Sequence, residues 1–326
     1  MLPSVSRTFA LTIPVLPERL AQVVANAYLV CRLADTIEDD VQLDQARKLE
    51  FHQRLVAIVR GKESAEAFAT ELLPLLSSRT SANERELVVG TASLVRVMET
   101  FSVAERLALT RCVGTMCAGM PKFQRRKSLR GFKNLEEMND YCYVVAGVVG
   151  EMLTELFCAH CSKLQPLREE MMYLAVSFGQ GLQMTNILKD IWDDRQANTC
   201  WLPRSVFRGN DFDIERLDKF HDSDSFRVGL QELIGIAHHH LRSALEYTSF
   251  IPPKESGMRK FCLRAIGLAI LTLRKIHSRP GFTNSQRVRI SRRSVRATIF
   301  VTDVTFSSDR ALRMLFSLAA KGLPLH

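Results

Sequence analysis

The sequence predicts an all-α fold in a single domain spanning residues 1–326. Apolar residues recur with the helical period along most of the chain and make up 46% of it, enough for a substantial core. The 16 glycines and 11 prolines are few for 326 residues, which disfavours an all-β protein with many tight turns. Because no solenoid repeat or low-complexity linker divides the chain, one helical domain is the simplest interpretation.

Segments rich in alanine, leucine and valine predict the successive helices, and most prolines fall between them. The segment over 298–306 is β-branched, so periodicity leaves its state ambiguous. The expected helices span residues 20–39, 45–59, 64–73, 84–101, 103–120, 135–158, 167–194, 225–247 and 257–277.

The net charge of +9 favours anionic partners: nucleic acid, lipid headgroups or phosphorylated small molecules. Two groups of basic residues, over 125–130 and 287–296, carry part of this charge. Because neither group has interleaved aromatic residues, we do not expect nucleic acid as a partner. The charge therefore fits phosphorylated substrates and leaves peripheral contact with a membrane open, and it says nothing of the oligomeric state.

The eight cysteines are dispersed and lie mostly in apolar segments, which is typical of a reducing cytosol. Cys158 and Cys161 form half a zinc motif, but no second pair with ligand spacing follows. The start of the chain has no signal-peptide pattern, and the run over 265–273 is far shorter than the ~20 residues of a spanning helix. We therefore expect a cytoplasmic protein without a transmembrane helix.

Two acidic clusters give the strongest functional signal. Asp35-x-x-Glu38-Asp39 and Asp190-x-x-Asp193-Asp194 each place carboxylates at positions i, i+3 and i+4, on one face of a helix. Such carboxylates repel one another, and a hard divalent cation, usually Mg²⁺ where phosphate is bound, would relieve the repulsion. Two such faces opposite each other across a helical cavity would bind a diphosphate through metal.

The alternative for each cluster is a solvated acidic helix surface. The residues that precede the clusters, over 28–34 and 183–189, include several apolar ones. The carboxylates are therefore expected at the end of a buried stripe, where a metal site is the better interpretation.

Five motifs in order resemble the squalene/phytoene synthase family of head-to-head prenyl transferases. The resemblance runs from about residue 4 to 207, with a further stretch over 290–298. It is carried by Ser6-Arg7-Thr8-Phe9, Tyr28-x-x-Cys31-Arg32 before the first cluster, the segment Tyr141–Gly150, Gln183-x-Thr185-Asn186 before the second cluster, and Trp201-Leu202-Pro203.

The resemblance implies an isoprenoid-synthase helical fold around a central cavity. Its reaction joins two isoprenoid diphosphates, and Mg²⁺ assists the departure of pyrophosphate. The catalytic residues that it implies are Tyr141, Asp35, Asp39, Asp190 and Asp194. The metal ligands that it implies are Asp35, Glu38, Asp39, Asn186, Asp190, Asp193 and Asp194.

Substrate contacts follow from the same resemblance. Tyr141 would stand near the reacting carbons, with a packed core tyrosine as the alternative. Small residues near it would leave room for a prenyl chain, and an apolar wall would keep water from the carbocation. The substrate and diphosphate contacts are Ser6, Arg7, Phe9, Arg32, Lys189, Gln183, Ala146, Val149 and Gly150.

Within the family, the residues around the first cluster and the Ser291–Ser294 stretch look most like squalene synthases. That choice implies condensation of two farnesyl diphosphates through presqualene diphosphate to squalene, with hydride from NADPH. An alternative stops at presqualene diphosphate, or yields dehydrosqualene or phytoene without hydride. An alternative of another class is a non-catalytic helical scaffold. Both acidic clusters are intact, which argues against this alternative.

Overall fold

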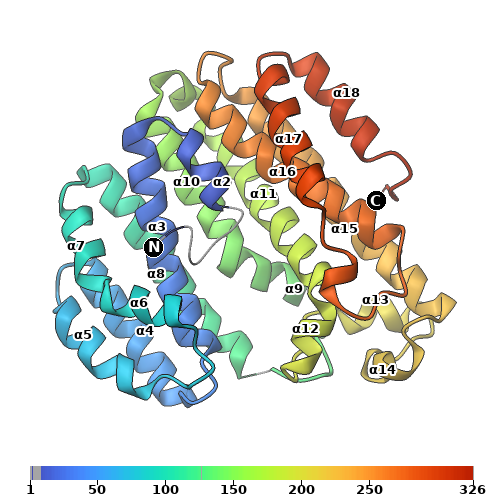
Figure 1. Ribbon diagram of the computed structural model, residues 1–326, viewed down its shortest axis with the longest axis horizontal. Helices are drawn as coiled ribbons and strands as arrows, with labels where there is room; N and C mark the ends of the chain where they lie inside the picture. The colour runs from blue at the N-terminus through green and yellow to red at the C-terminus, as the bar shows by residue number, and fades with distance from the viewer. Residues whose placement is uncertain (1, 3–8, 126, 326) are drawn as a thin grey trace. The chain divides into compact units, whose positions relative to one another are not determined.

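The computed structural model describes residues 2, 9–125 and 127–325 (Figure 1). Every regular element assigned in this part of the chain is a helix, apart from one isolated bridge between Phe132 and Pro203. The all-α prediction is therefore confirmed. The chain forms two compact units, 1–126 with 151–168 and 127–150 with 169–326, which we describe separately.

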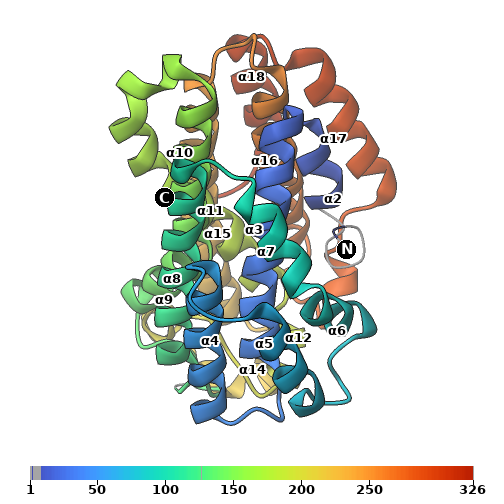
Figure 2. The same cartoon turned by 90° about the vertical axis from the view of Figure 1, so that its left-hand side faces the viewer.

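The first unit is built around α3, α4 and α8, which pack on one another, and the shorter α5, α6 and α7 pack beside them (Figure 2). The hydroxyls of Ser81 and Ser102 cap α6 and α8, and Glu84 and Glu105 return the bond in two capping boxes. The helices of this unit are α2 (Phe9–Thr12), α3 (Glu18–Asp39), α4 (Gln45–Val59), α5 (Ala65–Leu72), α6 (Ala82–Val89), α7 (Thr91–Glu99), α8 (Val103–Gln124) and most of α10 (Val148–His160).

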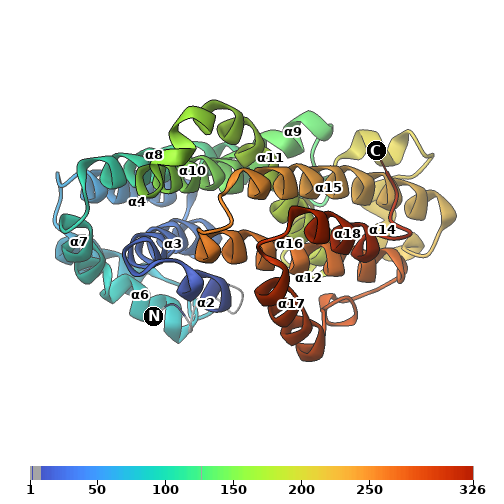
Figure 3. The same cartoon turned by 90° about the horizontal axis from the view of Figure 1, so that it is seen from above.

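The second unit is centred on α15 and α16, which pack along each other and carry α13, α17 and α18 (Figure 3). Its helices are α9 (Leu135–Cys142), α11 (Arg168–Lys189), α12 (Ile191–Gln196), α13 (Arg204–Arg208), α14 (Leu217–Phe220), α15 (Asp224–Phe250), α16 (Ser256–His277), α17 (Arg292–Thr305) and α18 (Asp309–Ala319). A π-helical turn, η3 (Tyr143–Gly147), continues α9, and short 3₁₀ turns, η4 (Ser162–Leu167) and η6 (Ser285–Arg287) among them, lie between helices.

Several helix boundaries differ from the expected ones. The helix expected over 84–101 is divided at Gly90, and the one expected over 167–194 is interrupted at Asp190. Helix α8 continues through Pro121 for one more turn, so the missing N–H of this proline does not end the helix. The ambiguous segment over 298–306 lies mostly in α17, so packing outweighs its β-branched composition.

One stretch, Leu135–His160, is long and apolar enough to cross a membrane by length and composition. The sequence predicted a helix over 135–158, but only the uninterrupted apolar run over 265–273 was compared with the length of a membrane span. Within its most apolar window 44% of the residues are buried inside the protein, and core helices meet the same criteria. All eight cysteines are buried free thiols.

Candidate active site

The first acidic cluster lies at the C-terminal end of α3, whose helix runs unbroken from Glu18 to Asp39. The three carboxylates share one face but differ in exposure, since Glu38 is buried, Asp35 is partly exposed and Asp39 is exposed. The helix itself therefore fixes the spacing that the sequence predicted. Each carboxylate meets a different amount of solvent.

Arg32 lies one turn before Asp35 and provides a positive charge inside this cluster. Its guanidinium is 3.7 Å from the Asp35 carboxylate and 2.5 Å from that of Glu84, on α6. Glu84 was not among the predicted site residues, although its S-x-x-E capping box was visible in the sequence. Arg32, predicted to bind phosphate, is thus paired with carboxylates in this structure.

Crowding by protein atoms raises the pKa of Asp35 to about 7, although 35% of its side chain remains exposed. Arg32 opposes this rise, whereas the charges of Asp39 and Glu84 add to it. The ionised cluster is therefore under-neutralised, and the charge of a divalent cation would favour its deprotonated form.

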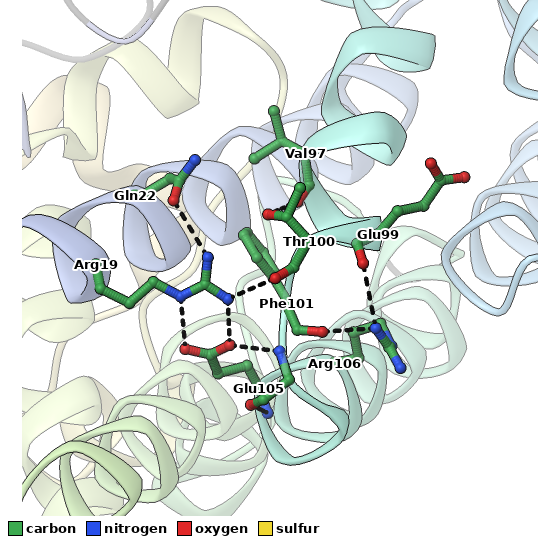
Figure 4. A network of polar contacts seen from close by, with 9 residues as sticks. Arg19, Gln22, Val97, Glu99, Thr100, Phe101, Glu105 and Arg106 are labelled. Atoms are coloured by element: carbon green, nitrogen blue, oxygen red, sulfur yellow. Dashed lines mark hydrogen bonds and ion pairs between the residues drawn. The ribbon is translucent and has the colours of Figure 1, made fainter.

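Helix α3 is held at both ends. At its start, Arg19 binds Glu105 and the Thr100 carbonyl, with 2.7 and 2.8 Å contacts (Figure 4). At its end, the Asp40 carboxylate accepts hydrogen bonds from the Ser77 amide and the Thr80 hydroxyl. Burial alone would raise the pKa of Asp40, but these bonds outweigh it and lower the pKa. Asp40 is thus a structural carboxylate beside the cluster.

The second acidic cluster lies where α11 gives way to α12. Asp190 has φ −99° and ψ 13°, outside the helical range, so it separates the two helices. Its carbonyl still accepts the Asp194 amide at 2.9 Å, so a helix-like turn continues across the break. Arg195 then fixes α12 through a two-bond contact to Asp218, at 2.9 and 2.6 Å.

A lysine provides the internal positive charge of this cluster. Lys189 Nζ lies 3.1 Å from the Asn186 amide oxygen and 3.1 Å from the Asp190 carboxylate. Burial raises the pKa of Asp190, Lys189 opposes the rise, and Asp193 adds to it. Lys189, predicted to bind phosphate, therefore joins two of the predicted metal ligands, while Gln183 lies partly buried on α11.

Asp193 is exposed, and its carboxylate accepts a 2.6 Å hydrogen bond from the Ser285 hydroxyl of η6. The neighbouring Trp192 indole donates to the Phe282 carbonyl at 2.5 Å. Sequence reasoning missed Ser285, because 92 residues separate it from Asp193 and no local motif marks it.

Tyr141 lies in an aromatic group with Trp201 and Phe132. Its ring stacks on Trp201 with centroids 4.5 Å apart and planes 8° apart, and Phe132 lies 5.5 Å from Tyr141. Backbone pairing of 128–132 with 200–204 brings these rings together. Gly131 permits it, since its φ is +71° and a Cβ there would be 2.3 Å from the Leu202 carbonyl.

The small residues after Tyr141 lie at a close contact between helices. A Cβ on Gly150 would be 2.2 Å from the Ala175 carbonyl, and one on Gly179 would be 2.3 Å from the Ala146 carbonyl. Helix packing thus accounts for Gly150 without a substrate. The role of Ala146, Val149 and Gly150 as a wall for a prenyl chain stays a prediction.

The donor set of each cluster suits Mg²⁺, which takes oxygen ligands and is bound through one or two carboxylates plus substrate phosphates. Among the described residues, no three His, Cys, Asp or Glu side chains converge closely enough to hold a metal by themselves. Each cluster would therefore bind Mg²⁺ together with water or phosphate oxygens. The under-neutralised Asp35 and Asp190 are the best-placed carboxylates for this purpose.

Two predicted diphosphate contacts, Ser6 and Arg7, lie outside the described residues. Phe9 is described: its ring lies 4.9 Å from that of Tyr28, so α2 packs on α3. A surface pocket of about 450 Å³ lies elsewhere in the first unit, between the end of α4 and the helices α7 and α8, and it contains none of the predicted site residues.

The sequence profile of squalene/phytoene synthases matches residues 2–294. The chain belongs to this family. Similar curated proteins include the squalene synthase ERG9 of Candida albicans, 26% identical over 284 residues, and a squalene synthase of Nicotiana benthamiana, 30% identical over 281 residues. Each match covers 84% of this chain. The chain spans 60 and 62% of the length of these two relatives.

Solved structures agree with the family assignment at the level of the fold. A ligand complex of TcSQS superposes with a TM-score of 0.79 at 22% identity, covering 98% of this chain and 89% of that one. A dehydrosqualene synthase complex gives a TM-score of 0.70 at 20% identity, covering 93% of both chains. The squalene/phytoene synthase family is generally Mg²⁺-dependent, which agrees with the oxygen donors of the two clusters.

Proposed function

We propose that this protein joins two farnesyl diphosphates head to head, through presqualene diphosphate, and reduces the product to squalene with NADPH. Membership of the squalene/phytoene synthase family over residues 2–294 carries the proposal. The two carboxylate clusters, each with a basic side chain inside it, support it because they combine the metal-binding and phosphate-binding groups that the reaction needs.

Diphosphate binding is assigned to the two clusters. When bound, Mg²⁺ neutralises the diphosphate and makes it a better leaving group. In this proposal the metal would be held by the residues that the family resemblance implies: Asp35, Glu38 and Asp39 of the first cluster, and Asn186, Asp190, Asp193 and Asp194 of the second. Arg32 and Lys189, which contact Asp35 and Asp190 in this structure, would bind the phosphate oxygens.

The aromatic group is assigned to the carbocation. The faces of aromatic rings are negative and attract cations, and Lys127 Nζ already lies 5.7 Å from the ring centroid of Trp201. In this proposal the stacked Tyr141 and Trp201 hold the prenyl cation close to the rings and away from water. The Tyr141 hydroxyl relays the proton that is lost when the cyclopropane ring closes: it gives its own proton to pyrophosphate as its oxygen takes up the proton from carbon.

The reduction is assigned to NADPH, which would supply a hydride to the cation left when the remaining diphosphate of presqualene diphosphate departs as pyrophosphate. Its phosphates need cationic partners, and Lys122 and Arg125, at the C-terminal end of α8, are both exposed. In this proposal these two side chains bind the cofactor phosphates. The chain has no nucleotide-binding Gly-x-Gly-x-x-Gly motif, and the proposal requires none, because the family that it resembles has no Rossmann domain.

Product analysis with farnesyl diphosphate and Mg²⁺, with and without NADPH, tests the proposal. Squalene formed only with NADPH supports it. Presqualene diphosphate or dehydrosqualene in both reactions would replace it with the alternative that lacks hydride transfer, which the same family includes. Turnover of geranylgeranyl diphosphate alone would change the substrate to the C20 chain, and no turnover of either would favour the scaffold.

A further inference from the structure

The last two helices carry an unusual share of the exposed apolar surface. Of the thirteen large hydrophobic residues that are exposed in the described part of the chain, five lie between residues 300 and 325. Their exposed fractions run from 56 to 74%, and they are Phe300, Val304, Met314, Leu318 and Leu325. Single exposed hydrophobics are normal on a protein surface, but a local concentration of them marks a contact surface.

On each helix the exposed apolar residues follow basic residues along one stripe. Phe300 and Val304 lie four residues apart on α17, with Arg293 and Arg296 seven and four residues before Phe300 on the same stripe. On α18, Met314 and Leu318 repeat this spacing. Arg310 precedes them by one turn, so the stripe on α17 presents two cations and the stripe on α18 presents one, each followed by two hydrophobic side chains.

The opposite faces of these helices make the packing contacts. Thr298 and Thr302 of α17 are buried, and Thr298 lies so close to α16 that a Cβ on Gly267 would be 2.6 Å from its methyl group. Leu312 of α18 packs with Leu245 and Leu263. The fold therefore does not need the outward stripes for its stability.

In the region of α17 and α18 the acidic side chains are paired, whereas most of the basic ones are not. Its two acids are neutralised from α16: Asp303 binds Arg264 at 2.9 Å, and Asp309 binds Arg259. Six exposed cations form no ion pair in the described structure: Arg292, Arg293, Arg296, Arg310, Arg313 and Lys321. The surface of α17 and α18 thus presents unpaired positive charge beside exposed hydrophobic side chains.

We propose that this α17–α18 surface, formed by Arg293, Arg296, Phe300, Val304, Arg310, Met314 and Leu318, binds the face of an anionic lipid bilayer. Amphipathic helices with arginine and bulky apolar side chains bind bilayers this way: the apolar residues enter the interface and the cations meet the lipid phosphates. The protein would then lie on the membrane without spanning it. The inference does not depend on the reaction that the protein catalyses.

Flotation with vesicles tests this surface in the full chain. We expect the protein to float with phosphatidylcholine vesicles that contain 30% phosphatidylglycerol, not with pure phosphatidylcholine, and to be released by 0.5 M NaCl because salt screens exposed charges. Phe300→Ser with Met314→Ser should weaken partitioning at least tenfold. Arg293→Gln with Arg296→Gln should weaken it similarly on anionic vesicles.

Matched controls separate this surface from general charge and hydrophobicity. Val103→Ser with Leu107→Ser removes two exposed apolar residues of α8, and Arg79→Gln with Arg208→Gln removes two exposed arginines elsewhere. Both pairs should float like the parent. The proposal is wrong if the parent stays in solution, or if the control pairs lose as much binding as the α17–α18 pairs. It is also wrong if Phe300→Ser with Met314→Ser leaves binding intact but converts a dimer to a monomer, which would make the surface an interface between copies.

Discussion

The two acidic clusters have the same carboxylate spacing but are built on different backbones. The first lies on the uninterrupted α3, where helix geometry and Arg32 fix Asp35. The second lies across the break at Asp190, where Ser285, from another part of the chain, holds Asp193. The same motif can therefore be preorganised either by local helix geometry or by a tertiary hydrogen bond, and the two cases respond differently to mutation.

The largest expected effect is the loss of activity when either cluster loses a carboxylate. Asp35→Asn and Asp190→Asn should each lower kcat/KM at least about a hundredfold, because even indirect support of a metal ligand is worth 10–100-fold. Thermal unfolding should show no loss of stability, since both changes remove a charge that burial disfavours. Glu169→Gln, an exposed change in the first turn of α11, is the control and should keep full rate. Near-normal rate in either variant would contradict the metal assignment.

The second largest effect is expected at the aromatic group of Tyr141, Trp201 and Phe132, whose role differs from that of the two acidic clusters. Tyr141→Phe keeps the ring that stacks on Trp201 and removes only the hydroxyl. We expect kcat to fall by about 10²–10⁴-fold, the usual contribution of a positioned proton-transfer group, with KM little changed. Steady-state kinetics measure both constants. A rise in KM at unchanged kcat would show that the hydroxyl serves binding only.

Next to the first cluster, Asp40 should behave oppositely to Asp35. Asp40→Ala leaves the Ser77 amide and the Thr80 hydroxyl without their charged acceptor, so unfolding free energy should fall by about 3 kcal/mol. Chemical denaturation measures this loss, while the rate per folded molecule should stay within about threefold of the parent. Unchanged stability would mean that Asp40 does not hold the end of α3.

A smaller effect is expected at Ser285, which distinguishes the second cluster from the first. Ser285→Ala removes the donor to Asp193 and should raise the Mg²⁺ concentration needed for half-maximal rate about tenfold, with kcat at saturating Mg²⁺ nearly unchanged. A Mg²⁺ titration measures it. Ser278→Ala, an exposed serine at the end of α16, should leave the titration unchanged. Equal curves for Ser285→Ala and the parent would show that tertiary support is unimportant there.

The smallest expected effect is on stability in the absence of metal. Since the folded pKa of Asp35 is raised to about 7, the folded state binds this proton more tightly than the unfolded state. The stability that the protonated Asp35 contributes is therefore present at low pH and is lost as pH rises from about 4 to about 7. Thermal unfolding in EDTA should show this slope, which Asp35→Asn should reduce. Equal slopes in the two proteins would mean that Asp35 is not the group responsible.

Most of the fold could be predicted because its helices follow local apolar periodicity and capping residues. The observed helix boundaries differ from the predicted ones where packing or a single backbone bond sets the end of a helix, as at Gly90, at Asp190 and beyond Pro121. The short α13 and α14 were not predicted, since helices of four or five residues leave too little periodicity to detect. Helix α18 was missed although its pattern is strongly amphipathic, and Leu312 is the one residue of this helix that is buried.

The sequence by itself determined the family, the helical class and the two carboxylate clusters, because all three depend on residue types at short, fixed spacings. Only the tertiary structure decided which groups surround those carboxylates. In the tertiary structure Arg32 pairs with Glu84, and Ser285 donates a hydrogen bond to Asp193. Tyr141 stacks on Trp201, and Asp40 accepts a hydrogen bond from the Ser77 amide at the end of α3. These contacts join residues that lie far apart in the chain, and their strength depends on burial and distance, which no local pattern encodes.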